Sequence, residues 1–200
     1  MPNWCLNTIR VVGDNDSVNK IPSFFVKKDS SEYLDFTQLI PLEKKEDITL
    51  DLNQRSEFWG IKSSGMEING YNIKSLDKNN SMLEFESDTP WNPPLSFFYW
   101  ISNMYPTLLF QVVYDEPGMS FSGNFIVQNG EILESDEYEE STMTWALEEE
   151  LENEKDPKRK KELQKMINYK VNLGKKWMKS PNKLLKIRND KIKKDFIKCC

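Results

Sequence analysis

Apolar and polar residues alternate along much of the first two thirds of the chain, which is the pattern of half-buried β-strands. In residues 5–12, for example, Cys5, Ile9 and Val11 fall on one face. We predict strands or extended segments at residues 5–12, 34–42, 81–88, 108–114 and 119–127. Asn129-Gly130 then favours a tight turn, because both residues tolerate positive φ, and residues 131–134 can return as the partner strand.

Apolar residues at helical spacing predict two helices between these strands. Residues 17–26 have this spacing, although Pro22 should shorten or kink the helix. Residues 95–105 follow Pro93-Pro94 and carry a wide apolar stripe, so this helix should be largely buried. The polar stretch 43–55 is typical of a loop or surface turn.

The order of these elements is strand-helix-strand, an insert, then strand-helix-strand and a hairpin. This split βαβ order is typical of the ferredoxin-like sandwich, in which helices cover one face of a mainly antiparallel sheet. We therefore predict an α+β domain over residues 1–134 with an added hairpin, followed by a charged helical extension over residues 135–200.

Three helices are predicted in the extension from capping residues and apolar spacing. The first is acidic and covers residues 142–154. The second begins after Asp156 with Pro157 at its first position and ends before Gly174. The third covers residues 181–197 and carries an apolar stripe within a basic surface, which could bind an acidic groove or pack across the sheet.

Charge is divided sharply along the chain. Residues 79–154 contain no Lys or Arg but 16 Asp and Glu, whereas residues 155–200 contain 17 Lys and Arg against 4 Asp and Glu. An acidic surface suits a partner that normally binds a polyanion, although the acidic block could instead pair with the protein's own tail. The partner-binding acidic surface is expected at Glu137, Glu139, Glu140, Glu148, Glu149, Glu150 and Glu152.

Composition limits the possible chemistry. The chain is 38% hydrophobic and 12% aromatic, which supports a packed core, and it shows neither a membrane-length apolar run nor a leader, so we expect a soluble protein in the host cytoplasm. The absence of histidine excludes histidine-based nucleophile pairs and the usual nitrogen ligands of zinc. Cys5, Cys199 and Cys200 provide neither a disulfide framework nor metal-ligand spacing.

The remaining candidates are carboxylates, aromatic residues and the basic tail. Glu84, Glu86 and Asp88 share one strand face and could serve acid-base chemistry or a divalent cation, although a solvated face is the simpler interpretation. A ligand pocket, with core packing as the alternative, could form from Trp4, Asn7, Trp59, Lys62 and Trp91. Contacts to nucleic-acid phosphates could come from Lys158, Arg159, Lys160, Lys161, Lys175, Lys176, Lys186 and Arg188.

Several separated segments recur in the same order in one family. They are Met1-Pro2-Asn3-Trp4-Cys5-Leu6-Asn7, Phe58-Trp59-Gly60-Ile61-Lys62, Thr89-Pro90-Trp91-Asn92-Pro93-Pro94, Tyr105-Pro106, and Tyr114-Asp115-Glu116-Pro117-Gly118 followed by Phe121-Ser122-Gly123. Through them, residues 1–134 resemble the plasmid- and phage-encoded YubB-type, Api-like proteins. The resemblance implies a ferredoxin-like domain and a mobile-element origin, with no established activity. Ser63-Ser64-Gly65 replaces a second Trp that is usual in such proteins.

These observations favour a non-enzymatic binding protein without a cofactor or metal. We expect a counter-defence inhibitor whose acidic surface engages a nucleic-acid-handling host protein, such as a CRISPR effector. The alternative is a protein that binds a nucleotide-like ligand in an aromatic pocket, or that binds RNA or DNA through the basic tail.

Overall fold

The computed structural model describes residues 3–28 and 31–199. Met1 and Pro2 of the first family segment, and Cys200 at the C-terminus, lie outside the described residues.

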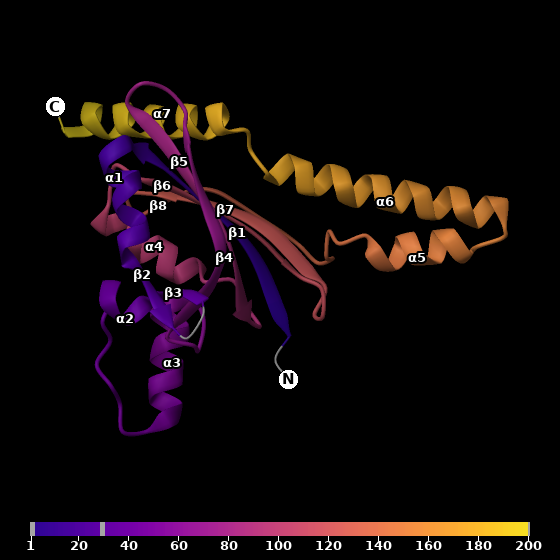
Figure 1. The fold of residues 1–200 in the computed structure, drawn as a ribbon, viewed down its shortest axis with the longest axis horizontal. Coiled ribbons are helices and arrows are strands. Elements are labelled where there is room, and N and C mark those ends of the chain that lie inside the picture. Colours follow the sequence, from indigo (N-terminus) through magenta and orange to yellow (C-terminus); the bar gives the residue numbers. More distant parts are fainter. Residues whose placement is uncertain (1–2, 29–30, 200) are drawn as a thin grey trace.

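The described strands form one eight-stranded antiparallel sheet in the order β2-β3-β4-β5-β1-β6-β7-β8 (Figure 1). The strands are β1 (Trp4–Asp14), β2 (Phe25–Lys28), β3 (Ser31–Asp35), β4 (Gly65–Ser75), β5 (Asn80–Pro90), β6 (Leu109–Glu116), β7 (Phe121–Gln128) and β8 (Glu131–Tyr138). Both β5 and β6 pair antiparallel with β1, so they run parallel to each other, and helix α4 (Leu95–Met104) connects them. This is a split βαβ unit, and the predicted α+β class and the β7–β8 hairpin are confirmed.

One face of the sheet, here called the inner face, is covered by short helices. They are α1 (Asn15–Lys20), the 3₁₀-helix η1 (Ile21–Phe24), α2 (Phe36–Leu39), α3 (Ile48–Trp59) and α4. Cys5, Ile9 and Val11 of β1 point into this core, as their alternation predicts. Phe36 and Phe97 stack within it, with ring centroids 3.8 Å apart. The main hydrophobic core therefore lies between the inner face and these helices.

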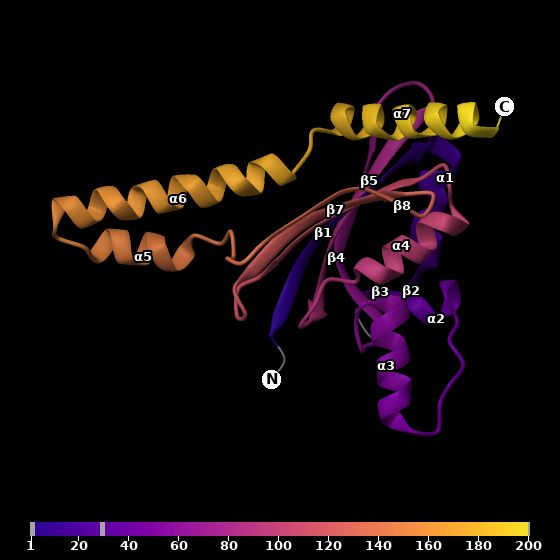
Figure 2. The same cartoon turned by 180° about the vertical axis from the view of Figure 1, so that it is seen from behind.

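The opposite face, here called the outer face, is partly covered by the C-terminal region. Helix α7 (Pro181–Cys199) lies across it, and Leu184 is fully buried there against an apolar patch of four strands formed by Val12, Met82, Leu109 and Ile126 (Figure 1). Helices α5 (Trp145–Asn153) and α6 (Pro157–Trp177) form a helical hairpin that projects away from the sheet (Figure 2). Of the two alternatives given for the third helix of the extension, packing across the sheet therefore holds for α7.

The expectation of a loop at residues 43–55 is also wrong, because α3 begins at Ile48. Oδ1 of Asp47 accepts hydrogen bonds from the backbone N–H groups of Thr49 at 2.8 Å and Leu50 at 3.1 Å, which caps the helix. Gly60 ends it with φ of 78°. The capping residues Asp47 and Gly60, rather than an apolar stripe, determine where this helix begins and ends.

Residues 34–42 are extended only at their start. β3 ends at Asp35, whose carboxylate caps α2 by accepting the Thr37 N–H at 2.9 Å. The helix expected at residues 17–26 is shortened as Pro22 indicates, since α1 passes into η1 and β2 begins at Phe25. β4 was not predicted.

Two boundaries in the C-terminal region differ from expectation. α6 continues through Gly174 to Trp177, whose side chain is buried and whose carbonyl accepts a hydrogen bond from Gln111 at 2.8 Å. Tertiary burial therefore extends the helix beyond the residue that should end it. The domain boundary placed after residue 134 falls inside β8. Among residues 3–28 and 31–199, no helix combines the length and apolar character needed to cross a membrane.

The burial of α7 on the outer face predicts a stability effect. Leu184→Ala should lower the free energy of unfolding by about 2 to 4 kcal/mol, because it removes buried methyl groups and leaves a cavity. Lys186→Ala, at an exposed position of the same helix, should change it by less than about 0.5 kcal/mol. Urea denaturation measures both values, and equal effects of the two substitutions would contradict the docking of α7.

Candidate functional site

The carboxylates on the outer face of β8 and just beyond it are matched by cations of the tail, which we define as residues 155–199. The ion pairs are Lys191 and Lys194 with Glu131 (2.9 and 3.2 Å), Lys179 with Glu134, Lys176 with Asp136 (3.9 Å), and Lys170 with Glu140 (3.6 Å). The hydrogen bonds from Lys191 and Lys194 lower the pKa of Glu131 below its usual value. Part of the acidic block is therefore already neutralised within the molecule.

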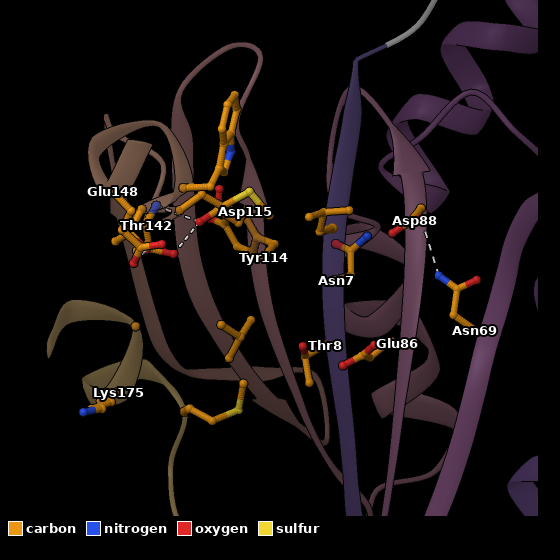
Figure 3. Close-up of a pocket in the computed structure, with 17 residues that line it drawn as sticks. Asn7, Thr8, Asn69, Glu86, Asp88, Tyr114, Asp115, Thr142, Glu148 and Lys175 are labelled. Carbon is orange, nitrogen blue, oxygen red and sulfur yellow. Dashed lines mark hydrogen bonds between the residues drawn. The ribbon is translucent and has the colours of Figure 1, made fainter. Parts of the chain in front are cut away.

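A second part of the acidic block surrounds an open cavity on the outer face (Figure 3). This outer groove has a volume of about 690 Å³ and lies beside the region that α7 covers. β5, β1 and β6 form its floor, and the start of α5 and the end of α6 form its far wall. The side chains that line it include Leu6, Thr8, Glu86, Asp88, Val113, Asp115, Met143, Trp145, Glu148, Lys175 and Met178.

Strand register determines which side chains enter the outer groove. Leu6 lies opposite Asp88 and Thr8 opposite Glu86, and partners in an antiparallel pair share one face. Val113 lies opposite Thr8 on the other neighbour of β1. The floor consequently presents the apolar side chains of Leu6 and Val113 beside the two acids of β5.

The outer groove has an excess of negative charge. Its acidic residues are Glu86, Asp88, Asp115 and Glu148, and Lys175 is the single cationic residue among the described residues that line it. Figure 3 shows the acids on opposite sides of the opening, with Glu148 and Asp115 on one side and Glu86 and Asp88 on the other. All four carboxylates come from residues 79–154, the segment without Lys or Arg. The acidic segment of the sequence therefore contributes an acidic region of the surface.

Asp115 has a structural role at this site. Its carboxylate accepts hydrogen bonds from the Ser141 hydroxyl and from both the backbone N–H (2.7 Å) and the hydroxyl of Thr142. These bonds fix the connection between β8 and α5 and hold Trp145 and Glu148 at the groove. Asp115 is therefore a positioning residue, whereas Glu86 makes no ion pair or hydrogen bond with other described residues and Asp88 accepts one weak hydrogen bond.

The weak hydrogen bond to Asp88 is donated by Asn69, which lies in a β-bulge. The register of β4 against β5 shifts between Ile68 and Tyr71, and Gly70 in this bulge has φ of 104°. Nδ2 of Asn69 lies 3.4 Å from Oδ2 of Asp88. The bulge thus directs an amide toward the rim of the outer groove. Asn69 and Asp88 also line a second cavity of about 330 Å³, which we call the Trp4 cavity.

The structure does not assemble the ligand pocket that the sequence suggested. Trp59 is buried in the inner core, where its Nε1–H donates to the Ile40 carbonyl at 3.2 Å. Trp4 and Trp91 are half-exposed, and Lys62 is exposed. Core packing, the alternative that the sequence left open, holds for Trp59.

Asn7 is buried and serves the backbone of the sheet. Its amide donates to the Cys5 carbonyl at 2.9 Å, the Ser87 carbonyl at 3.1 Å and the Thr89 hydroxyl at 2.9 Å. Asn7 lines the outer groove and Trp4 lines the Trp4 cavity, so these two residues lie at neighbouring cavities rather than in one aromatic pocket.

The predicted acidic surface is divided into separate parts. Glu137 accepts a hydrogen bond from the Tyr114 hydroxyl at 3.2 Å, and Glu139 is exposed beyond β8. On α5, Glu150 pairs with Arg159 at 2.9 Å, whereas Glu149 and Glu152 are exposed. Glu148 alone among the seven predicted residues lines the outer groove. The sequence analysis assigned no partner-binding role to Glu86 and Asp88, although their spacing on one strand face indicated that they act together.

The predicted nucleic-acid contacts are also divided. Lys158, Lys160 and Lys161 are exposed near the start of α6, and Lys186 is exposed on α7. Arg159 and Lys176 are in the ion pairs given above, and Lys175 lines the outer groove.

Arg188 was expected to contact phosphate, and the structure contradicts this. It is buried and donates from Nε to the Thr107 carbonyl at 2.7 Å and from Nη1 to Oδ1 of Asn80 at 2.9 Å. Burial lowers the pKa of its guanidinium. Arg188 therefore anchors α7 to the sheet.

The buried thiol of Cys5 and the spacing of possible metal ligands bear on the chemistry open to the described residues. Burial, followed by the nearby charges of Glu116 and Asp115, raises the pKa of the Cys5 thiol well above its usual range, which disfavours the reactive thiolate. Among residues 3–28 and 31–199, no three Asp, Glu or Cys residues are grouped closely enough to hold a metal ion.

Three of the family segments meet at the end of the sheet beside the Trp4 cavity. The backbone N–H of Trp91 donates to the Asn3 carbonyl at 2.9 Å, and a Cβ added at Gly118 would lie 2.7 Å from the Asn3 side chain. Trp91 has φ of 70°, which is uncommon for a bulky residue. The shared segments thus build one structural corner.

Comparison with known proteins finds a family match over part of the chain. Residues 70–157 match the family model described as the ferredoxin-like domain in Api92-like protein. Over these residues the chain is similar to the ferredoxin-like domain of Api92-like proteins. The resemblance stated from the sequence is confirmed. The matched residues include Glu86, Asp88, Asp115 and Glu148 of the outer groove.

Among solved structures, the chain is similar to the crystal structure of a protein api92 from Yersinia pseudotuberculosis. The identity is 18%, the TM-score is 0.39, and the match covers 52% of this chain and 39% of that chain. No curated protein matches the sequence significantly. The description of the matching family model names a ferredoxin-like domain and no activity.

Proposed function

We propose that this Api92-like protein is a non-enzymatic binding protein whose outer groove receives a basic segment of a nucleic-acid-handling host protein. The observation that supports the proposal most directly is the distribution of charge. The tail pairs with the carboxylates of β8, whereas Glu86, Asp88 and Glu148 make no ion pair with other described residues.

The chemistry of the outer groove fits such a segment. Proteins that handle nucleic acids present clustered Lys and Arg to phosphates, and a row of carboxylates can occupy the same positions. Val113 and Met178 provide apolar surface for the aliphatic stems of those side chains, while the carboxylates face the charged ends. A single-sign field also accelerates association with a basic partner.

The proposed biological role is counter-defence. The family resemblance implies a mobile-element origin, and host defence systems include nucleic-acid-binding effectors with positively charged channels, of which a CRISPR effector is one example. The proposal requires binding to protein and no reaction, cofactor or metal.

Removing the groove charges should weaken binding to a basic peptide. We expect the triple variant Glu86→Gln, Asp88→Asn, Glu148→Gln to raise the Kd for an octalysine peptide by about 3-fold to 150-fold, because three exposed ion pairs contribute about 0.2 to 1 kcal/mol each. Isothermal titration calorimetry at low salt measures the change.

The matched control changes the same number of charges elsewhere. Glu43→Gln, Glu46→Gln and Glu57→Gln lie before or within α3, at exposed positions. If this control weakens binding as much as the groove variant, net charge rather than the outer groove explains the affinity, and the proposed site is wrong. The same two variants can then be used to capture proteins from nuclease-treated host lysate. The control should retain the basic host protein, and the groove variant should not.

A second candidate function is RNA or DNA binding by the tip of the helical hairpin. Lys158, Lys160 and Lys161 are exposed near the start of α6, at the end of the hairpin farthest from the sheet (Figure 1). This position separates them from the acidic groove, which would otherwise repel a polyanion.

The hairpin-tip candidate predicts a measurable salt dependence. Replacing Lys158, Lys160 and Lys161 with Gln should reduce the slope of log Kobs against log salt by about 2 to 3, because each phosphate contact releases nearly one counterion. Fluorescence anisotropy with a labelled oligonucleotide measures the slope. The control variant, Lys183→Gln with Lys186→Gln on α7, should leave the slope unchanged. If the α6 variant also leaves the slope unchanged, this candidate is ruled out.

A further inference from the structure

The Trp4 cavity lies directly beside the outer groove on the same face of the sheet. Asn69 and Asp88 line both cavities, so the two volumes of about 330 and 690 Å³ meet at these side chains. Trp4 is on β1 opposite Pro90, two residues before Leu6 on the groove floor. An extended segment bound in the outer groove could therefore continue into the Trp4 cavity.

The acids of the Trp4 cavity are placed against each other. Glu67 of β4 lies opposite Asp88 of β5 in the sheet register, and both are on the outer face. Like charges directly opposite each other on neighbouring strands destabilise a sheet. Among the described residues that line the Trp4 cavity there is no Lys or Arg. Within this described lining the Glu67–Asp88 pair has no cationic partner, so a bound cation would relieve the repulsion.

Trp4 provides the second half of the site. Its side chain is 52% exposed although it begins a central strand, so its indole has a face available to a ligand. A guanidinium stacks on an indole and can bond two carboxylates through its planar set of donors. An ammonium group has neither planar stacking nor the forked geometry. The combination of an indole, two opposed carboxylates and a small volume fits one arginine side chain.

We propose that the Trp4 cavity is an arginine-specific subsite of the outer groove. The guanidinium stacks on Trp4 and pairs with Glu67 and Asp88, while the rest of the basic segment lies over β1 and β5. This inference rests on the proposed function and identifies arginine, rather than lysine, as the residue that the partner presents here.

The test compares octa-arginine with octalysine by isothermal titration calorimetry on the full chain. The wild type should bind octa-arginine about tenfold more tightly, which corresponds to a cation–π and bidentate contribution of ordinary size. Trp4→Ala should remove most of this preference and leave octalysine binding within about twofold, because the groove carboxylates remain. Glu67→Gln should reduce the preference in the same direction.

Trp91 provides the matched control. It is 45% exposed at the same end of the sheet, but it is absent from the described residues that line either cavity. Trp91→Asn, which tolerates the positive φ there, should keep the full arginine preference. Circular dichroism and thermal unfolding establish that each variant is folded, and Glu67→Gln, at an exposed position, tests the subsite without removing an aromatic side chain.

Three results would overturn the inference. Equal affinity of the wild type for both peptides, or equal loss of preference in Trp4→Ala and Trp91→Asn, would exclude an arginine subsite while leaving the outer groove as a general basic-segment site. Absence of binding to both peptides would instead contradict the proposed function itself, and the subsite with it.

Discussion

The burial of the outer face by α7 is the interaction on which the arrangement of charges depends. Val12, Met82, Leu109 and Ile126 form an apolar patch on this face, and Leu184 is fully buried against it. Burying one leucine contributes about 1.5 to 3 kcal/mol, whereas an exposed ion pair contributes about 0 to 1 kcal/mol. Packing of Leu184 therefore contributes more than any one exposed ion pair, and the ion pairs between the tail and β8 help to fix the position at which α7 lies.

This docking determines which acids remain for a partner. Lys179, at the connection between α6 and α7, is buried and paired with Glu134, and Lys191 on α7 is paired with Glu131. α7 stops short of the other half of the outer face, where Glu86 and Asp88 lie on β5. The two opposed charge blocks of the sequence thus neutralise each other only in part. The remainder forms an acidic groove with an apolar floor, which is the chemistry of a site for a basic peptide.

Strand alternation was sufficient to predict β1 and β5, because each has one face in the main core, and a near-continuous apolar run predicted β6, which is largely buried on both faces. Alternation could not predict α3, since Ile48 and Leu50 are exposed and the helix depends on the Asp47 cap and the Gly60 stop. The sequence pattern also failed to predict that α6 continues past Gly174, because burial of Trp177 stabilises the last turn of this helix. For the site, Glu148 was found through charge density. The roles of Glu67 and Asp88 depend on cross-strand register and on the bulge at Asn69, which local sequence does not specify.

The central claim is that the tail occupies the carboxylates of β8 and leaves the outer groove open to a basic ligand. Titration of the ¹⁵N-labelled full chain with octalysine, followed by two-dimensional NMR, tests this most directly. The account predicts shifts concentrated at the amides of Leu6, Thr8, Val113 and Trp145, with β8 and α7 unchanged. Shifts concentrated at Glu131, Glu134 and α7 would show that the peptide displaces the tail, and would contradict the account.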